Sequence, residues 1–594
     1  MSGVTLPDLP VTETLPALQN ALEAPGHAVL VAPPGAGKTT LVPLALLEAA
    51  WSQAGHIVLL EPRRLAARAA ARRMASLIGE EPGRTVGYAM RMERKVSEHT
   101  RILVVTEGVL ARMIIDDPGL EGVSAVIFDE FHERSLDADF ALALALDVRG
   151  ALRPDLRLLV MSATLDGARV AALLDGAPVL ESAGRSFPVE IRYAERKPQT
   201  AVEDAVAEAV RTLLAETSGS ILAFLPGQRE IARTQDILSG RLPQTIDVVP
   251  LHGGLEPAAQ DAAIRPPPPG QRKIILATAI AETSVTIDGV TAVVDSGLSR
   301  LPKYEPATGL TRLETVRVSR ASADQRAGRA GRTAPGVALR LWREEQTAAL
   351  PAFTPPEILE ADLSGFLLDC AAFGVSHPAQ LAFLDLPPRA GLKEARALLE
   401  TLGALDEAGR LTEDGAAMRR LALPVRLAHM VAMAARISAG PGFRGRTTRS
   451  LRCCLARHSS CCTCLWNRAD KLGGSGVDLD ERLSRFAVER SPRAKTARAL
   501  ADRLARLASD RSDASAAATS VAAGPLLVHA WPDRIAKARG EYGHFVLANG
   551  RGGQLDPSEK LASEPHLIVA DPQGKARHSR ITSAAAIAGE DVVP

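Results

Sequence analysis

Short apolar runs alternate with amphipathic, Ala- and Leu-rich stretches over about the first 180 residues of the chain. Each run is too short for a helix and lacks the polar alternation of a half-exposed strand. The runs occupy residues 28–32, 57–60, 102–105, 125–128 and 158–161. Strands that are apolar on both faces, with helical segments between them, predict a parallel sheet covered by helices.

The same alternation starts again after residues 181–188 (ESAGRSFP), although the two halves share no close sequence repeat. The second set of predicted strands lies at 221–225, 246–251, 273–277 and 291–295. Past about residue 357 the strand pattern nearly stops, and helical patterns continue to about residue 509. A Ser-, Ala- and Asp-rich stretch at 510–524 predicts a linker. Short strand-like runs such as 544–548 and 567–570 follow it.

The composition is that of a globular protein and excludes several classes. The 594 residues are enough for about four domains. With 70 Lys+Arg against 69 Asp+Glu, the net charge of +1 excludes nucleic-acid binding through bulk basic charge. Any such binding therefore requires a local groove. Aromatic residues make up only 3%, so we expect aliphatic cores.

Nothing in the sequence indicates export or a membrane. No run reaches the ~18 apolar residues of a membrane span. The N-terminus has neither the basic nor the apolar region of a secretory signal. Six cysteines are too few for a disulfide scaffold. We therefore expect a cytoplasmic protein with no membrane partner.

Residues 29–40 (VLVAPPGAGKTT) follow a predicted strand and precede a helical pattern at 41–50. This is the pattern of a phosphate-binding loop, with Ala32 where the usual motif has its first glycine. Glycines let backbone N–H groups approach phosphate, and the following helix N-terminus favours the anion. Lys38 would reach the β- and γ-phosphates, and Thr39 would bind Mg²⁺. The predicted nucleotide-binding residues are Pro34, Gly35, Ala36, Gly37, Lys38, Thr39 and Thr40.

An acidic box at 129–132 (DEFH) closes the predicted strand 125–128. Asp129 is suited to complete the Mg²⁺ site with Thr39, and Glu130 is suited to activate the attacking water. An acidic pair after a strand is often only a solvated turn. The phosphate loop upstream favours the catalytic interpretation.

These two motifs, with others that follow in order, resemble the DEAH/RHA type of superfamily 2 helicases. The box reads Asp-Glu-Phe-His here rather than Asp-Glu-Ala-His. The other stretches that are similar to family motifs are 61–67 (EPRRLAA), 106–110 (TEGVL), 162–164 (SAT), 224–230 (FLPGQRE), 278–284 (TAIAETS) and 325–332 (QRAGRAGR). Because eight motifs occur in the family's order over about 300 residues, the resemblance is specific.

The resemblance implies two tandem RecA-like parallel-sheet α/β domains, followed by winged-helix, helical-bundle and small β-rich regions. The implied boundaries are 1–182 for the ATP-binding domain, 183–345 for the second RecA-like domain, 346–420 for the winged helix, 421–510 for the bundle, 511–524 for a linker and 525–594 for the β-rich region. Stretches at 362–364, 383–388 and 402–406 match the family's winged-helix region, and 532–540 matches a signature of bacterial members. Because the chain stops at Pro594, earlier than the resemblance implies, we expect the last region to be incomplete.

The resemblance also implies an ATP- and Mg²⁺-dependent helicase that moves 3′ to 5′ along single-stranded or partly duplex nucleic acid, RNA rather than DNA. Arg329 and Arg332 would act as arginine fingers and Gln325 would orient water, so hydrolysis would require closure of the two domains. The residues expected to couple nucleotide state to the domain interface are His132, Ser162 and Thr164.

Nucleic acid would cross the opposite face of both domains. Sequence-neutral contacts to phosphates suit a motor that steps along any strand. Two strands predicted within 298–319 resemble the family's strand-separating hairpin. The candidate contacts are Arg63, Arg64 and Thr106 from the first domain, and Arg229, Thr283 and Ser284 from the second.

Two further features depart from the family pattern. Ala279 stands where the family usually has Asn, so we expect weaker coupling at the domain interface. Residues 441–470 hold six Arg, five Cys and one acidic residue. The flanks of this segment, 425–435 and 479–507, both have the pattern of amphipathic helices.

The cysteine-rich segment has two interpretations. One is a metal site built from Cys453, Cys454, His458, Cys461, Cys462 and Cys464. Its spacing lacks the Cys-x₂₋₄-Cys pairs of structural zinc. The other is a compensated frameshift in a GC-rich gene, because CTG-CTG codons for Leu-Leu give Cys-Cys when read one base late. One zinc per chain, or resequencing that confirms the frame, would exclude the frameshift.

Two other functions stay open on the sequence alone. A damaged bundle segment and a missing end would fit a degraded paralogue that binds ATP or nucleic acid without unwinding. The other is a phosphate-loop NTPase that acts on protein partners, which the motifs at 61–67, 106–110 and 278–284 disfavour. The sequence leaves open the oligomeric state, the base selectivity and the physiological substrate.

Overall fold

The fold is that of a computed structural model. It describes residues 7–24, 26–91, 93–163, 167–184, 187–240, 242–282, 287–306, 309–439, 472–508, 522–574 and 578–589. The chain divides into two compact units. The first contains residues 1–305, 309–361 and 379–388, and the second contains the rest. Thr164, Thr283, Ser284 and the cysteine-rich segment 441–470 lie outside the described residues.

The first sheet confirms the predicted parallel α/β domain. Among the described residues it has eight strands in the order β4-β3-β5-β2-β6-β7-β1-β8, all parallel except the β3–β4 pair. Its strands are β1 (His27–Val31), β2 (His56–Glu61), β3 (Val86–Met90), β4 (Glu93–Lys95), β5 (Ile102–Thr106), β6 (Val123–Phe128), β7 (Arg157–Ser162) and β8 (Val179–Glu181). All five predicted strands are present. The edge strands β4 and β8 have exposed residues, so the apolar pattern does not mark them, and the buried strand β3 was not predicted.

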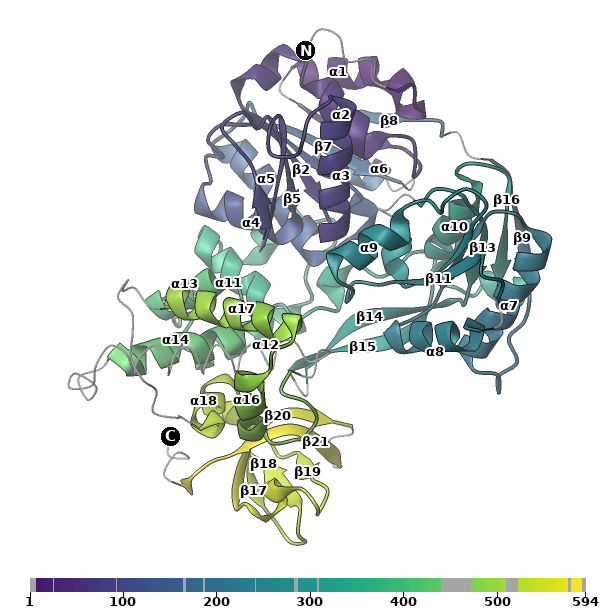
Figure 1. The fold of residues 1–594 in the computed structure, drawn as a ribbon. Coiled ribbons are helices and arrows are strands. Elements are labelled where there is room, and N and C mark those ends of the chain that lie inside the picture. The colour runs from purple at the N-terminus through teal and green to yellow at the C-terminus, as the bar shows by residue number, and fades with distance from the viewer. Residues whose placement is uncertain are drawn as a thin grey trace. The chain divides into compact units, whose positions relative to one another are not determined.

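Helices flank this sheet (Figure 1). They are α1 (Leu15–Glu23), α2 (Lys38–Leu46), α3 (Arg64–Leu77), α4 (Glu107–Asp116), α5 (Leu136–Ala151) and α6 (Gly167–Leu173). The predicted helical pattern at 41–50 corresponds to α2, which begins at Lys38 and ends at Leu46. The core is aliphatic as expected, with residues such as Leu30, Leu59 and Ile127 completely buried. This packing fixes the carboxyl ends of β1, β2, β6 and β7 beside one another.

The second sheet is entirely parallel, in the order β11-β12-β10-β13-β16-β9 over the residues that the structure describes. Its strands are β9 (Val189–Tyr193), β10 (Ser220–Phe224), β11 (Ile246–Leu251), β12 (Arg272–Ala277), β13 (Val290–Asp295) and β16 (Gly336–Arg340). Its helices are α7 (Val202–Glu216), α8 (Gln228–Leu238), α9 (Pro257–Ile264) and α10 (Arg320–Gly328). The predicted hairpin is present as β14 (Leu298–Glu305) and β15 (Leu310–Arg317), which pair from Leu298↔Arg317 to Glu305↔Leu310.

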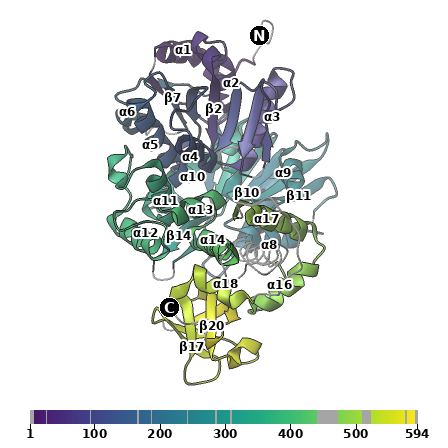
Figure 2. The ribbon, with the colours of Figure 1, turned by 90° about the vertical axis from the view of Figure 1, so that its left-hand side faces the viewer.

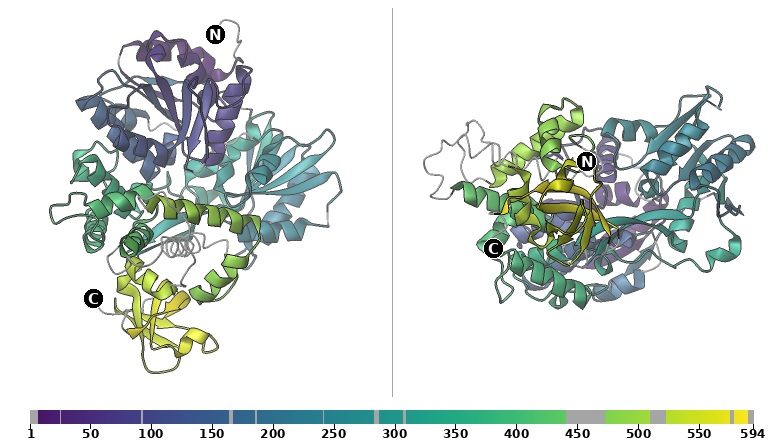
Figure 3. Two further views of the ribbon diagram at one scale, coloured as in Figure 1. Left: turned by 60° about the vertical axis from the view of Figure 1, so that its left-hand side comes forward. Right: turned by 90° about the horizontal axis from the view of Figure 1, so that it is seen from below.

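The second unit contains helices and a small closed β-barrel (Figure 2). The helices described there are α11 (Ser364–Phe373), α12 (Arg389–Thr401), α13 (Glu413–Leu421), α14 (Val425–Ala439), α16 (Leu479–Val488), α17 (Pro492–Ala508) and α18 (Ala523–Ala530). The barrel strands are β17 (Ile535–Ala538), β18 (His544–Leu547), β19 (Gly552–Gln554), β20 (His566–Gln573) and β21 (Ser579–Ala586). Helix α18 packs on β20 and β21, and the strands (yellow in Figure 3) enclose a core that includes Phe545 and Ile581.

One predicted helix is wrong. The single amphipathic helix expected over 479–507 is two helices, α16 and α17, which are separated at residues 489–491. Pro492 cannot continue a helix because it has no N–H group and its ring clashes with the preceding turn. It is tolerated at the first helical position, where α17 begins.

No helix in the described part of the chain is long and apolar enough to span a bilayer.

Core packing predicts the effect of a truncation in the first sheet. Leu59→Ala removes a completely buried side chain from β2 and should lower the free energy of unfolding by about 2–5 kcal/mol. The matched control is Leu152→Ala, because Leu152 is 57% exposed and should change that energy by no more than about 0.5 kcal/mol. Urea unfolding followed by tryptophan fluorescence measures both variants, and equal effects would contradict the assigned core.

Candidate nucleotide site

The phosphate loop connects β1 to α2 and contains two glycines in left-handed backbone. Gly35 has φ +88° and Gly37 has φ +93°, a region that glycine adopts without a steric penalty. A Cβ on Gly35 would have no atom within 4 Å, so space is open at that point of the loop. Ala36 is buried, and Gly37 directly precedes the first turn of α2.

Lys38 lies among carboxylates at the carboxyl end of the first sheet. Its Nζ is 3.0 Å from Glu130 Oε1 and 4.0 Å from Asp129 Oδ1, and all three side chains are buried. The Thr39 hydroxyl donates a hydrogen bond to Asp129. The Glu130 N–H donates to Asp129 Oδ1 at 2.8 Å. The structure therefore brings the loop and the acidic box together, as the sequence predicts.

The two box carboxylates have opposite pKa shifts. Burial raises the pKa of Asp129 to about 6, with the charge of Glu130 adding to it and Lys38 opposing it. Burial also acts to raise the pKa of Glu130, but the charge of Lys38 and its hydrogen bond to Glu130 outweigh burial and lower that pKa to about 2. Glu130 is thus a carboxylate at neutral pH, the state that a general base requires.

Glu61, at the end of β2, belongs to the same cluster and was not among the predicted site residues. Its side chain is buried beside Asp129, and its Oε2 has no hydrogen-bond partner among the described residues. Burial, followed by the charges of Asp129 and Glu130, raises its pKa well above the ordinary value. The signal in the sequence was a carboxylate that closes a fully apolar strand.

These residues fit a magnesium–nucleotide complex by the chemistry of their donors. The Thr39 hydroxyl and the Asp129 carboxylate are the hard oxygen ligands that Mg²⁺ prefers, and Mg²⁺ usually takes its remaining ligands from water and phosphate. Accordingly, no group of three or more His, Cys, Asp or Glu side chains in the described ranges is arranged to hold a metal by itself.

His132 connects the acidic box to the second domain. Its Nε2 lies 2.9 Å from the amide nitrogen of Gln325, and its Nδ1 lies 3.4 Å from Glu130 Oε2. The Ala163 N–H, next to Ser162 at the end of β7, donates to Nδ1 at 3.3 Å. Burial lowers the pKa of His132, with Glu130 opposing it, so the ring is neutral at pH 7. The predicted residues His132 and Gln325 are therefore in contact, and Ser162 directly precedes the residue whose N–H bonds to His132.

The two predicted arginine fingers are at the end of α10 and in the turn after it. Arg329 is buried, and its Nε donates to the Glu282 carbonyl at 2.9 Å. Burial and then the charge of Arg332 lower the pKa of Arg329, and burial lowers that of Arg332 to about 10. The negative charge of a bound phosphate would raise both pKa values again, because it favours the charged form of each guanidinium.

Glu282 is a second residue that the sequence predictions missed. Its carboxylate accepts from Arg326 Nε at 3.1 Å and from the Ser322 hydroxyl, while Arg326 also pairs with Asp295 at 2.8 Å. Arg326 is completely enclosed, so this network holds α10 against β13. The first arginine of the 325–332 motif, Arg326, is thus bonded within its own domain.

The predicted nucleic-acid contacts differ in their surroundings. Arg63 is partly exposed, and its Nη1 donates to the Ala279 carbonyl at 2.7 Å while its Nη2 pairs with Glu133 at 3.2 Å. Arg64 and Arg229 are exposed at the starts of α3 and α8. Thr106 lies at the end of β5, directly before α4.

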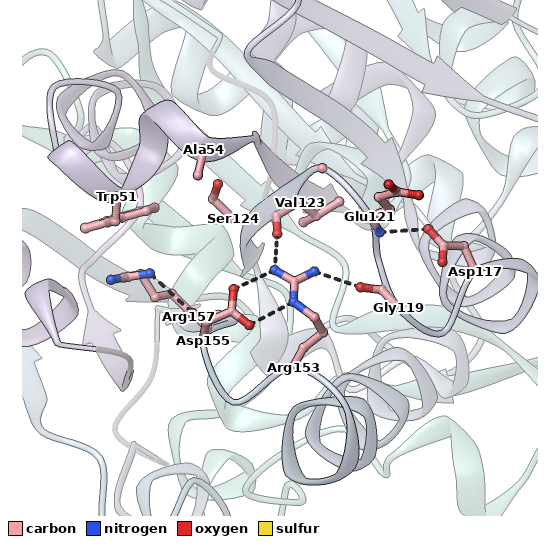
Figure 4. Close-up of a pocket in the computed structure, with 11 residues that line it drawn as sticks. Trp51, Ala54, Asp117, Gly119, Glu121, Val123, Ser124, Arg153, Asp155 and Arg157 are labelled. Carbon is pink, nitrogen blue, oxygen red and sulfur yellow. Dashed lines mark hydrogen bonds and ion pairs between the residues drawn. The ribbon is translucent and has the colours of Figure 1, made fainter.

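A separate cavity of about 620 Å³ lies at the amino ends of β6 and β7 (Figure 4). Its arginines are already bonded, since Arg153 pairs with Asp155 at 2.8 Å and donates to the Val123 carbonyl, and Arg157 donates to the Leu22 carbonyl. The cavity is on the edge of the sheet away from Lys38, and we do not assign the nucleotide to it.

Comparison with known proteins agrees with this geometry. Residues 13–173 match the DEAD/DEAH box helicase model, and residues 204–334 match the helicase conserved C-terminal domain. The crystal structure of Escherichia coli DEAH/RHA helicase HrpB has a TM-score of 0.86 and 44% identity, covering 98% of this chain and 71% of that one. The chain belongs to the DEAH/RHA helicase family.

Other helicases are also similar to this chain. The structure of E. coli DExH-box NTPase HrpB has a TM-score of 0.81 and 42% identity, covering 99% of this chain and 70% of that one. ATP-dependent RNA helicase HrpB of E. coli (strain K12) is 46% identical over 561 residues. ATP-dependent RNA helicase HrpA of the same strain is 36% identical over 443 residues. These matches cover 94% and 72% of this chain, but 66% and 34% of the two relatives. The chain thus spans just under two thirds of HrpB and one third of HrpA.

The methyl group added by an alanine substitution would have different neighbours at Gly35 and at Gly37. Gly35→Ala should lower the free energy of unfolding by about 1–2 kcal/mol, the cost of left-handed backbone. Gly37→Ala should cost more, because its Cβ would also lie 2.8 Å from Leu9 Cδ1. Urea unfolding without nucleotide measures both variants, and an equal loss would show that Leu9 moves aside freely.

Proposed function

We propose that the chain is an ATP-dependent helicase that couples ATP hydrolysis to 3′-to-5′ movement along RNA and to duplex unwinding. The observation that carries the proposal is the contact between Lys38 and Glu130 at the phosphate loop, next to His132 and Gln325. The printed names of the HrpB and HrpA relatives, each an ATP-dependent RNA helicase, support the polymer and the activity.

In this proposal, Thr39 and Asp129 would hold Mg²⁺. The ion would supply charge neutralisation at the β- and γ-phosphates. Lys38, now paired with Glu130, would turn to the phosphates and leave the Glu130 carboxylate to accept a proton from the attacking water. Arg329 and Arg332 would stabilise charge on the transferred phosphoryl group.

Movement would follow from the contacts between the two α/β domains. Gln325 touches His132 next to the base Glu130, and Arg63 bonds to the main chain at Ala279. Opening of the domains would break both contacts, so hydrolysis and domain position would be coupled. The exposed Arg64 and Arg229 are proposed phosphate contacts, one from each domain.

The first test is steady-state ATP hydrolysis with no nucleic acid, with single-stranded RNA and with single-stranded DNA. We expect RNA to stimulate the wild type most. Glu130→Gln, which removes the base, should lower kcat by about 10²–10⁴-fold while leaving ATP binding intact. Lys38→Ala should lose ATP binding and hydrolysis.

Polarity is tested on duplexes that carry a 3′ or a 5′ single-stranded overhang. Unwinding only from the 3′ overhang is the expected result, and unwinding only from the 5′ overhang would reverse the proposed direction. ATP binding with no hydrolysis under any condition would contradict the motor.

The pKa of Asp129 predicts an acid limit in the free enzyme. Because the pKa is raised to about 6, Asp129 is protonated below that value and ionised above it. The kcat/KM for ATP, which reports ionisations of the free enzyme, should therefore be flat above pH 7 and fall as pH drops through about 6. His132→Asn should keep this fall, and its disappearance in that variant would assign the limit to the histidine.

A further inference from the structure

The turn that follows the catalytic base contains unusual backbone. Glu130 has φ +49° and Arg134 has φ +51°, and they flank the short helical turn Phe131–Glu133. Residues with a Cβ rarely adopt left-handed backbone, which persists only where the surroundings enforce it. The turn that presents Glu130 and His132 must therefore be held by contacts outside itself.

Arg134 makes the strongest of these contacts. Its Nε and Nη2 donate to the two carboxylate oxygens of Asp139 at 3.0 and 2.9 Å, a bidentate pair that joins Arg134 to the first turn of α5. The same Nη2 lies 2.7 Å from Asp385 Oδ2. The Arg134 and Asp139 side chains are 10% and 2% exposed, so solvent screens this group far less than a surface ion pair.

Asp385 belongs to the segment that follows the second α/β domain. This segment leads directly into α12, which begins at Arg389. The charges of Arg134 and Arg169 outweigh burial and lower the pKa of Asp385, so it is ionised at neutral pH. Arg169 is the outer partner, 53% exposed and 3.2 Å from Asp385 Oδ1.

A second contact joins the same two parts of the chain. The Glu357 N–H donates to the Arg134 carbonyl at 3.0 Å. The Leu136 N–H donates to Glu357 Oε2, also at 3.0 Å. The turn is thus bonded on its main chain and through its guanidinium to residues that come after the second domain in sequence.

We propose that Arg134 is a positioning residue for ATP hydrolysis. By clamping Asp139 and Asp385, it holds the turn that carries Glu130 and His132 and ties this turn to the segment that enters α12. This inference rests on the proposed ATPase. It predicts that displacement of the segment changes the placement of the base without touching the phosphate loop.

The decisive variant is Asp385→Asn. The substitution keeps the shape of the side chain but removes its negative charge. It leaves the Arg134–Asp139 pair intact, so the contact between Arg134 and α5 is retained. The matched control is Arg169→Ala, which removes the exposed partner of Asp385 but leaves the Arg134–Asp385 contact. Asp385→Glu, which restores the carboxylate, should recover part of the activity.

In ATP hydrolysis by the full chain with saturating RNA, Asp385→Asn should lower kcat about threefold to thirtyfold, the range of coupling effects at such positions. The KM for ATP should stay within about twofold, because the phosphate loop is unchanged. Arg169→Ala should match the wild type. An unchanged kcat in Asp385→Asn, or an equal loss in Arg169→Ala, would overturn the proposal.

Amide hydrogen exchange without nucleotide gives a readout that needs no activity. Peptides covering residues 129–140 should exchange faster in Asp385→Asn than in the wild type, and at the wild-type rate in Arg169→Ala. Unchanged exchange in Asp385→Asn would refute the clamp. An inactive wild type would refute the proposed function, while exchange would still decide whether Arg134 holds the turn.

Discussion

The structure of the candidate site depends on an excess of buried negative charge at one edge of the first sheet. Parallel strands β2 and β6 end side by side, so Glu61, Asp129 and Glu130 are placed together with Lys38 as their nearest cation. Burial of charge is costly unless it is compensated. Here the compensation is partial, and the pKa values of Asp129 and Glu61 rise while that of Glu130 falls.

The remaining parts of the site are arranged around that charge. Thr39 adds a hydroxyl beside Asp129, and His132 adds a neutral ring beside Glu130. The second domain contributes an amide at Gln325 and the buried guanidinium group of Arg329. Positive groups from one domain thus complement negative groups of the other, and a phosphate chain with its metal ion would lie between charges of both signs.

Most of the fold and the phosphate site could be predicted from the sequence, because buried parallel strands and glycine-rich loops have strong local signals. Edge strands such as β8 and β9 have partly exposed side chains, so hydrophobic pattern alone does not mark them. Pro492 begins the second helix, but the amphipathic period continues across it, so the period alone predicts a single helix. The sequence places Glu61 at the end of an apolar strand, but the partners of Glu61 and of Glu282 come from distant segments and are seen only in the structure. The roles of the nucleic-acid candidates stay predictions.

The hydrogen bond between Arg63 and residue 279 bears on which substitutions the domain interface can tolerate. Arg63 bonds to the carbonyl oxygen of Ala279, a group that every amino acid provides. The identity of the side chain at 279 does not enter this bond, so the absence of the usual Asn leaves it intact. Tolerance to substitution at a domain interface therefore depends on whether the partner residue bonds to the side chain or to the backbone of the substituted residue. At this position, replacement of the side chain would not by itself remove the bond between the two domains.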